Sequence, residues 1–211
     1  MRTCTRRTAG ALAALGLLLG GTARADLITF ANIPSGTFGP GVTTTEGNFA
    51  YDVLPGSGTL FGNTSNAGNP PPHVEGGDNG GTLRIVRADV PGGQFTFEGL
   101  DVAQALATTS QTVRVIGLLG GVQQGEDDFA TSATSDSWLT VDSVNLSGVH
   151  IDELRVRLDG SLSPFQFEEA DNVRLTPASV TATPEPASLT LLGFGAVSLA
   201  GIGWRRREAV A

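Results

Sequence analysis

The chain has 211 residues, of which 21 are acidic and 13 are basic, and its formal net charge is −8 at pH 7. The acidic excess is concentrated between Asp26 and Thr183, where 19 acidic and six basic side chains give a net charge near −13. Such a charge argues against nucleic-acid binding, because affinity for nucleic acid depends on cationic side chains that neutralise phosphates. It is compatible with divalent cations and with solubility.

The first 25 residues have the pattern of a secretory signal peptide. Arginines at positions 2, 6 and 7 precede an apolar run from residue 9 to residue 21, and small residues follow. We therefore predict a signal peptide over residues 1–25, recognised by the secretion machinery. Cleavage is expected at an A-x-A site formed by Ala23 and Ala25, with Asp26 on the far side of the cut.

Two details of this segment refine the prediction. Thr8, Ala9 and Gly10 follow the arginine pair, where a twin-arginine signal usually has bulky apolar residues, so Sec export is favoured. Cys4 is the only cysteine of the chain and lies before the apolar run. The mature chain would then contain no disulfide, and its stability outside the cell would depend on a hydrophobic core or on bound ions.

Between the two ends, strand signals dominate and helix signals are nearly absent. Short apolar runs alternate with polar residues and are bounded by Gly, Pro and Asp. Eight such runs predict an all-β fold over residues 26–176, an antiparallel β-sandwich of jelly-roll-like type. The expected strands are residues 27–32, 47–54, 82–90, 94–102, 112–119, 138–144, 149–158 and 165–175.

Two of these strands contain a change of parity. In residues 94–102 the apolar positions shift from odd to even at Gly99, and in residues 149–158 they shift at positions 152–153. An extra residue in one strand restores a common inward face, so we predict a bulge or a strand break at both places.

Three segments are expected to lie outside the strands. Residues 56–81, rich in Gly, Asn and Pro, predict a long loop over one end of the sandwich. Residues 120–136 predict a second, polar loop. Residues 177–183, composed of Thr, Ala, Pro, Ser and Val, predict a linker between the domain and the tail.

The tail, residues 184–211, has three parts in a fixed order. A Pro-Glu-Pro tripeptide is followed by an uncharged run of 17 residues, then by a tryptophan and three arginines. A helix of that length reaches roughly 25 Å, at the short end of what crosses a hydrocarbon core of about 30 Å. We predict a transmembrane segment over residues 187–204, with the arginines in the cytoplasm. The motif residues are Pro184, Glu185, Pro186, Arg205, Arg206 and Arg207.

This three-part tail resembles the PEP-CTERM sorting signal of Gram-negative bacteria. The resemblance implies recognition by an exosortase, a membrane protease or transpeptidase that removes the tail and passes the protein to the cell surface. It also implies an association with exopolysaccharide production. An ordinary C-terminal membrane anchor with an incidental Pro-Glu-Pro sequence is the alternative.

Residues 94–102 and 167–175 carry a second, looser resemblance, to jelly-roll domains of the galactose-binding-like type. In such sandwiches a structural calcium ion often lies between a loop near the first strands and an acidic residue near the last. The resemblance implies Asp171, together with Glu46, as candidate calcium ligands. A solvated acidic surface is the alternative for Asp171.

The remaining candidate groups favour structural roles. His73 and His150 are the only histidines, and we expect them to be structural or surface groups because no further zinc ligand lies near either one in sequence. Residues 126–128 are three consecutive acids, and we expect a solvated loop there, with oxygen ligands for calcium as the alternative. No nucleophile, zinc-protease or phosphate-loop motif is present, so the chain is not expected to be an enzyme.

Trp138 is the candidate glycan-binding residue, because it follows the polar loop and sugar-binding sandwiches use aromatic platforms. A core position with its N–H bonded to a carbonyl is the alternative. Together these features predict an exported, surface-sorted, non-catalytic protein. It would be a structural or adhesive component of the extracellular polysaccharide matrix, or alternatively a calcium-supported carbohydrate-binding module.

Overall fold

The computed structural model describes residues 25–63, 72–77, 80–105, 109–158 and 167–178. Thirteen strands and no helix occur in these ranges. In this part of the chain no helix is therefore long and apolar enough to cross a membrane. The predicted signal peptide and the predicted transmembrane segment lie outside the described residues, as does most of the linker.

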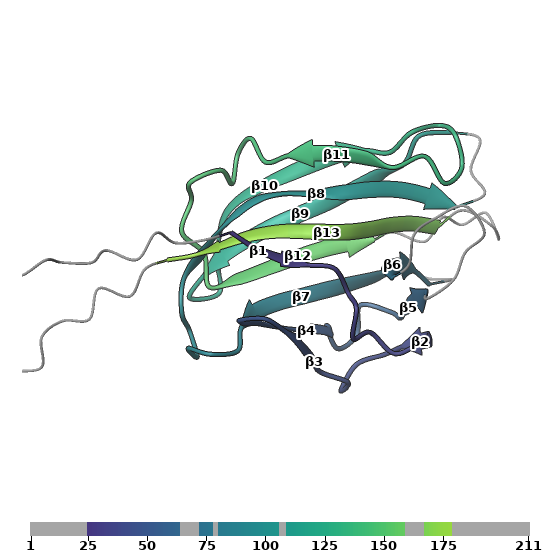
Figure 1. Ribbon diagram of the computed structural model, residues 1–211. Coiled ribbons are helices and arrows are strands. Elements are labelled where there is room, and N and C mark those ends of the chain that lie inside the picture. The colour runs from purple at the N-terminus through teal and green to yellow at the C-terminus, as the bar shows by residue number, and fades with distance from the viewer. Residues whose placement is uncertain (1–24, 64–71, 78–79, 106–108, 159–166, 179–211) are drawn as a thin grey trace, which may run out of the picture.

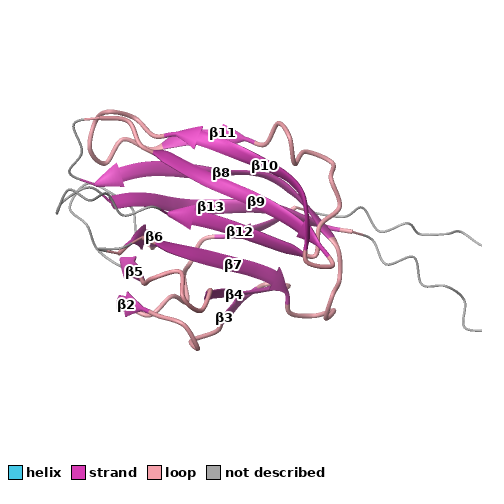
Figure 2. Ribbon diagram, turned by 180° about the vertical axis from the view of Figure 1, so that it is seen from behind, coloured by secondary structure: helices cyan, strands magenta, loops and turns pink. Residues whose placement is uncertain are grey.

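The strands form two antiparallel sheets that pack face to face (Figures 1 and 2). The first sheet has seven strands in the order β11 (Leu139–Asp142), β8 (Phe95–Ala105), β13 (Phe167–Pro177), β6 (His73–Gly76), β5 (Leu60–Asn63) and β2 (Gly36–Phe38), with β1 (Asp26–Ile28) also paired to β13. The second has six, in the order β10 (Val122–Ala130), β9 (Thr112–Leu119), β12 (Glu153–Leu158), β7 (Gly81–Arg87), β4 (Phe49–Val53) and β3 (Thr44–Glu46). The predicted antiparallel sandwich is confirmed.

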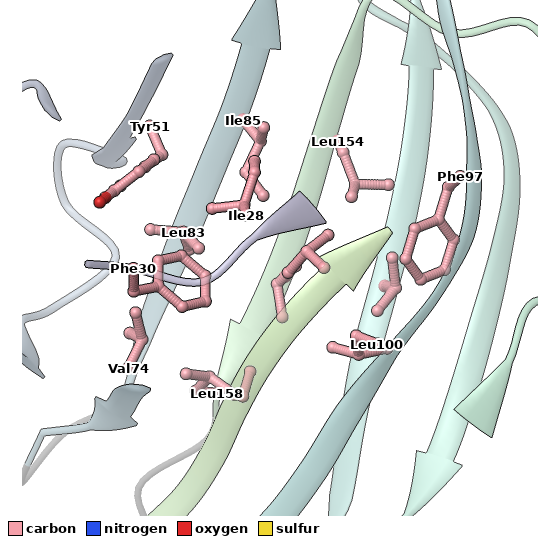
Figure 3. Close-up of a cluster of buried hydrophobic side chains, with 14 of the residues drawn as sticks. Ile28, Phe30, Tyr51, Val74, Leu83, Ile85, Phe97, Leu100, Leu154 and Leu158 are labelled. Carbon is pink, nitrogen blue, oxygen red and sulfur yellow. The ribbon is translucent and has the colours of Figure 1, made fainter. Parts of the chain in front are cut away.

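The core lies between the two sheets and follows from strict alternation along the strands. In β7 every second residue, from Gly81 to Arg87, is buried, and Leu83 and Ile85 are fully enclosed. Figure 3 shows side chains of both sheets, among them Ile85 and Leu100, gathered in this layer. Edge-on aromatic pairs complete it, including Phe49 and Phe95 with ring centroids 5.2 Å apart.

Both predicted irregularities are present. In β8 the apolar residues on either side of Gly99 are all buried, and the pairing of β8 with β13 shifts there, between Arg174 and Leu175. At positions 152–153 the strand breaks: Ile151 bridges to Phe95 of the seven-stranded sheet, whereas β12 begins at Glu153 in the six-stranded sheet. The change of parity therefore marks the point where the chain crosses between the sheets.

The predicted loop over residues 56–81 is wrong, because this segment contains β5 and β6 and ends where β7 begins. Its glycines allow close packing of backbone. A Cβ at Gly62 would lie 2.2 Å from the carbonyl oxygen of Pro34, and one at Gly77 would lie 2.5 Å from that of Thr59. Glycine here serves strand packing, which composition alone cannot distinguish from a loop.

The predicted loop over residues 120–136 is also wrong, because it contains β10. Gly120 and Gly121 have φ of 57° and 79°, as a two-residue hairpin turn with left-handed residues requires, and they join β9 to β10. β10 is an edge strand with mostly exposed side chains, which explains its polar sequence. The short strands β2 and β3 were not predicted, and the ends of the predicted strands differ by a few residues. β13 continues to Pro177, one residue beyond the expected domain end.

Gly99 provides a test of the bulge. A Cβ at this position would lie 2.2 Å from the carbonyl oxygen of Val141 and 2.3 Å from Nη2 of Arg174. We expect Gly99→Ala to lower the free energy of unfolding by about 2–4 kcal/mol, because the backbone of β11 would have to move. Gly39→Ala is the control, since a Cβ there meets nothing within 4 Å. Equal denaturation midpoints for the two variants would contradict the bulge packing.

Candidate functional site

The face of the seven-stranded sheet that points away from the core gathers polar side chains. On β6, His73 and Glu75 flank the core residue Val74, and on β13, Glu169 and Asp171 flank the core residue Ala170. Residues i and i+2 of a strand point to the same side of the sheet. The four polar side chains therefore share the outer face, and we call this surface the outer face below.

Strand register places these groups in two rows. Glu75 pairs with Glu169, which pairs in turn with Ala103 of β8. Two residues further along β13, Asp171 pairs with Asp101 of β8. Continuing the β6–β13 register by one residue places His73 opposite Asp171. Residues far apart in the chain are thus brought together by pairing with β13.

His73, Glu75 and Glu169 form the tightest cluster. Each offers one nitrogen or oxygen atom such that these atoms all lie within 4.8 Å of one another. Nε2 of His73 is 3.3 Å from Oε1 of Glu169, and both side chains are completely buried. Neither ring nitrogen of His73 and neither carboxylate oxygen of Glu169 has a hydrogen-bond partner among the described residues. His73 is therefore a buried residue of β6, whereas a position in the loop over residues 56–81 was expected.

Trp138 lies over this cluster. It directly precedes β11, and its ring meets the ring of His73 edge-on, with centroids 5.7 Å apart and planes at 67°. β8 and β13 separate β11 from β6 in the sheet, so the indole reaches across both strands. Trp138 is half-buried on the outer face, so the alternative of a core position is not what the structure shows. Its Nε1 is buried without a hydrogen-bond partner among the described residues.

Asp171, a predicted calcium ligand, lies at a gap along the edge of β13. β6 pairs with residues 169–170 and β1 with residues 173–175, which leaves Asp171 and Asn172 between them. Burial raises the pKa of Asp171 from 3.8 to about 7; a hydrogen bond from the Asn172 N–H and the charge of His73 oppose the rise, and the charges of Asp101 and Glu46 add to it. Such a carboxyl group is half neutral at pH 7 unless a cation stabilises its ionised form.

Glu46, the second predicted ligand, lies on β3 in the other sheet. Its Oε1 accepts hydrogen bonds from the N–H and the hydroxyl of Thr29, at 2.8 and 2.7 Å. Its Oε2 is buried without a hydrogen-bond partner among the described residues. Burial and the Glu46 charge together raise the pKa of Tyr51. The electrostatic effect of Glu46 on Asp171 places the two predicted ligands in one region, and calcium binding there stays a prediction.

A third acidic region lines a depression of about 600 Å³ between β10 and the segment 141–145. Asp127 is buried and accepts hydrogen bonds from the Ser143 hydroxyl at 2.7 Å and the Asn145 N–H at 2.9 Å. Asp128 pairs with Arg114 at 2.8 Å. The expected solvated loop at residues 126–128 is therefore an edge strand whose acids hold neighbouring segments in place.

His150, the other histidine, is exposed and lies outside the strands, although a strand was expected there. The three-residue cluster on the outer face was missed by the sequence analysis. The available signal was the alternation His73-Val74-Glu75, which puts two metal-binding side chains on one side of a strand. It was missed because the whole segment was interpreted as a loop.

Residues 182–207 match the family of the PEP-CTERM protein-sorting motif. The chain carries a PEP-CTERM sorting motif. The resemblance inferred from the tail is thus confirmed, and the motif implies export and processing at the cell envelope. In sequence, no curated protein matches the chain.

Several solved structures are similar in fold. The arabinose-bound α-L-arabinofuranosidase MgGH51 is 12% identical with a TM-score of 0.41, over 75% of this chain and 27% of that enzyme, so the chain spans about a quarter of its length. CBM29_1, a family 29 carbohydrate-binding module from Piromyces equi, is 15% identical with a TM-score of 0.37, over 78% and 97% of the two chains. The C-terminal family 22 carbohydrate-binding module of Clostridium thermocellum Xyn10B is 13% identical with a TM-score of 0.36, over 74% and 95%.

The raised pKa of Asp171 can be tested by the pH dependence of stability. Because its folded-state pKa of about 7 exceeds the ordinary value of 3.8, the folded state holds an extra proton between these pH values. Stability is therefore highest at low pH and falls as the pH rises from about 4 to about 7, by roughly 4 kcal/mol for this one group. The variant Asp171→Asn cannot ionise at this position. Its free energy of unfolding should therefore exceed that of wild type, and the difference should grow as the pH rises over this range.

Urea unfolding at a series of pH values, in chelator and without calcium, measures this difference. Asp128→Asn is the control, because that carboxylate is exposed and paired with Arg114. Parallel pH profiles for wild type and Asp171→Asn would show that Asp171 is ionised in the folded protein at neutral pH.

Proposed function

We propose that this protein is an exported, surface-sorted and non-catalytic component of the extracellular polysaccharide matrix, with a structural or adhesive role. The observation that carries the proposal is the sorting motif at residues 182–207, which follows within a few residues of the end of β13. The proposed organisation is a signal peptide (1–25), a jelly-roll-like sandwich (26–176), a linker (177–183) and a sorting signal (184–211) with a transmembrane segment at 187–204.

The route to the surface follows from the charge of the two ends. Sec export would deliver the domain across the inner membrane, and the three arginines at 205–207 would keep the C-terminus in the cytoplasm. The protein is then anchored only transiently, until an exosortase-type membrane protease cuts near Pro184–Pro186. Proline fixes its own φ and lacks a backbone N–H donor, which favours an extended segment that a protease can bind.

A non-catalytic role is supported by the acidic depression. Two of its carboxylates are engaged in hydrogen bonds or ion pairs with neighbouring segments, namely Asp127 and Asp128. Asp142 also bonds Arg174, at 3.0 Å. Groups committed in this way hold edge strands together, whereas a glycosidase needs a pair of carboxylates free to contact a sugar bond.

The second candidate is a carbohydrate-binding module supported by structural calcium. It is favoured by the half-buried Trp138 on the outer face, and by Asp171, a buried carboxyl group whose pKa is raised mainly by its burial. In this reading Trp138 contacts a sugar ring, while calcium bound by Asp171 and Glu46 fixes the gap between β1 and β6.

The sorting proposal is tested in the producing bacterium by replacing Pro184, Glu185 and Pro186 with alanine. We expect the altered chain to accumulate in the inner membrane with its C-terminus intact, because the protease no longer recognises it. Wild type should appear at the surface without the tail, as measured by fractionation and mass spectrometry. Thr181→Ala, just outside the motif, is the control. Recovery of wild type from the cytosol with Met1 and Ala211 both present would overturn the proposal.

The matrix and glycan roles are separated by binding assays with secreted polymer and a glycan array. A matrix component should associate with bulk polymer, and Trp138→Ala should change this little. A carbohydrate-binding module should bind a defined glycan saturably, and Trp138→Ala should abolish binding while Val144→Ala, at a residue 79% exposed, leaves it intact. If neither polymer nor any glycan retains the protein, both roles are wrong.

Calcium support has its own measurement. After chelation, added calcium should raise the melting temperature of wild type, because an ion that binds only the folded state stabilises it. Asp171→Asn should not respond. A melting temperature of wild type that calcium does not change would remove Asp171 and Glu46 as ligands.

A further inference from the structure

The buried cluster on the outer face is not explained by sorting or by glycan binding. Glu169 is a fully buried carboxylate, and neither of its oxygens accepts a hydrogen bond among the described residues. Burying an ionised carboxylate is strongly unfavourable unless a cation and hydrogen-bond donors compensate it. Glu75 lies opposite Glu169 across the strands and adds a second acidic side chain to the cluster.

Among the described residues, no arginine forms an ion pair with Glu169. The arginines with carboxylate partners elsewhere in the described residues are Arg84, Arg87, Arg114, Arg155 and Arg174. Arg157 lies on β12 of the other sheet. The side chain in contact with Glu169 that can carry a positive charge is that of His73. Its single imidazole lies near three carboxyl groups, which belong to Glu169, Glu75 and the opposing Asp171.

We propose that His73, Glu75 and Glu169 bind a divalent transition-metal ion, with zinc as the ion that fits best. Zinc bound at about 2.0–2.1 Å in tetrahedral geometry separates adjacent ligand atoms by about 3.3–3.4 Å. Nε2 of His73 and Oε1 of Glu169 lie 3.3 Å apart without making a hydrogen bond, which is the spacing of two ligands on one ion. The carboxylate of Glu75 completes three protein ligands after a small side-chain movement.

The donor set distinguishes this site from the calcium site considered above. Calcium takes six to eight oxygen ligands, whereas an imidazole with two carboxylates suits zinc and its neighbours among the transition metals. Three protein ligands leave one position for water or an exogenous group. Trp138 packs against His73 on the outer face, so it both shields the site and reports on it.

The competing explanation is a metal-free pair in which His73 and Glu169 share a proton. The two explanations predict different numbers of bound metal ions per chain and different responses to added zinc. A shared proton needs no ion, and it predicts no saturable zinc binding and no change of Trp138 emission on adding zinc.

The experiment uses the full chain in detergent with Cys4→Ser and Trp204→Phe, which remove the only thiol and the other tryptophan. After chelation and dialysis, zinc chloride is titrated while Trp138 emission and melting temperature are followed, and bound metal is counted by elemental analysis. We expect one zinc per chain and a melting temperature raised by about 5–10 °C at a zinc concentration 100 times Kd. Calcium and magnesium should not displace the zinc.

Ligand variants make the assignment specific. Loss of a group that hydrogen-bonds to a metal ligand typically weakens metal binding about 10- to 100-fold. His73→Gln and Glu169→Gln remove the proposed ligands themselves, so each should weaken zinc binding by more than this. His150→Gln, at the other histidine, and Glu126→Gln, on the exposed edge strand, should bind as wild type does. Circular dichroism checks folding, and Glu75→Gln, at a half-buried position, provides a third ligand variant should the fully buried ones not fold.

The proposal is overturned by any of three results. These are a folded wild type that binds no zinc, zinc binding that His73→Gln, Glu169→Gln or Glu75→Gln leaves unchanged in folded protein, and binding of calcium as tight as that of zinc. The sorting assay does not depend on these residues, so failure of the zinc site leaves the proposed function standing.

Discussion

The fold depends on β13, a central strand that buries carboxylates on both of its faces. Glu168 shares the inward side with Ala170, while Glu169 and Asp171 lie on the outer face, and all three acids are less than 9% exposed. This strand also joins β8 on one side to β6 and β1 on the other, so it cannot be displaced to let the charges reach water. Each carboxylate must be compensated where it lies. The raised pKa of Asp171 favours its neutral form, and Glu169 lies in contact with His73, so both acids reflect this one constraint.

The sequence predicted the parts of the fold in which apolar side chains alternate. β7, β8, β9 and β12 bury such side chains on one face, and their period of two is visible without any knowledge of neighbours. β5, β6 and β10 were missed because glycine, histidine and acids carry them. β5 and β6 form strands through close backbone packing around glycine, and β10 is polar because it is an exposed edge strand. Local hydrophobicity in the sequence indicates neither property.

The site was less predictable than the fold for a related reason. Asp171 could be singled out because acids near a final strand form a recognisable local pattern. The cluster on the outer face needs strand pairing between β6 and β13, which lie far apart in sequence, and Trp138 reaches it across two further strands. A histidine with one alternating glutamate is a common sequence. Only the register shows that a second glutamate, from β13, stands beside them.

The pairing of β1 with β13 has a consequence for how the domain is assembled. Asp26 lies opposite Leu175, so the first strand of the described chain finds its partner in the last one. A polypeptide that emerges N-terminus first exposes β1, β6 and β8 long before the strand that unites them. The seven-stranded sheet can close only when nearly the whole chain has emerged, because closure depends on contacts of very long sequence separation. Before β13 emerges, β1, β6 and β8 lack their common partner.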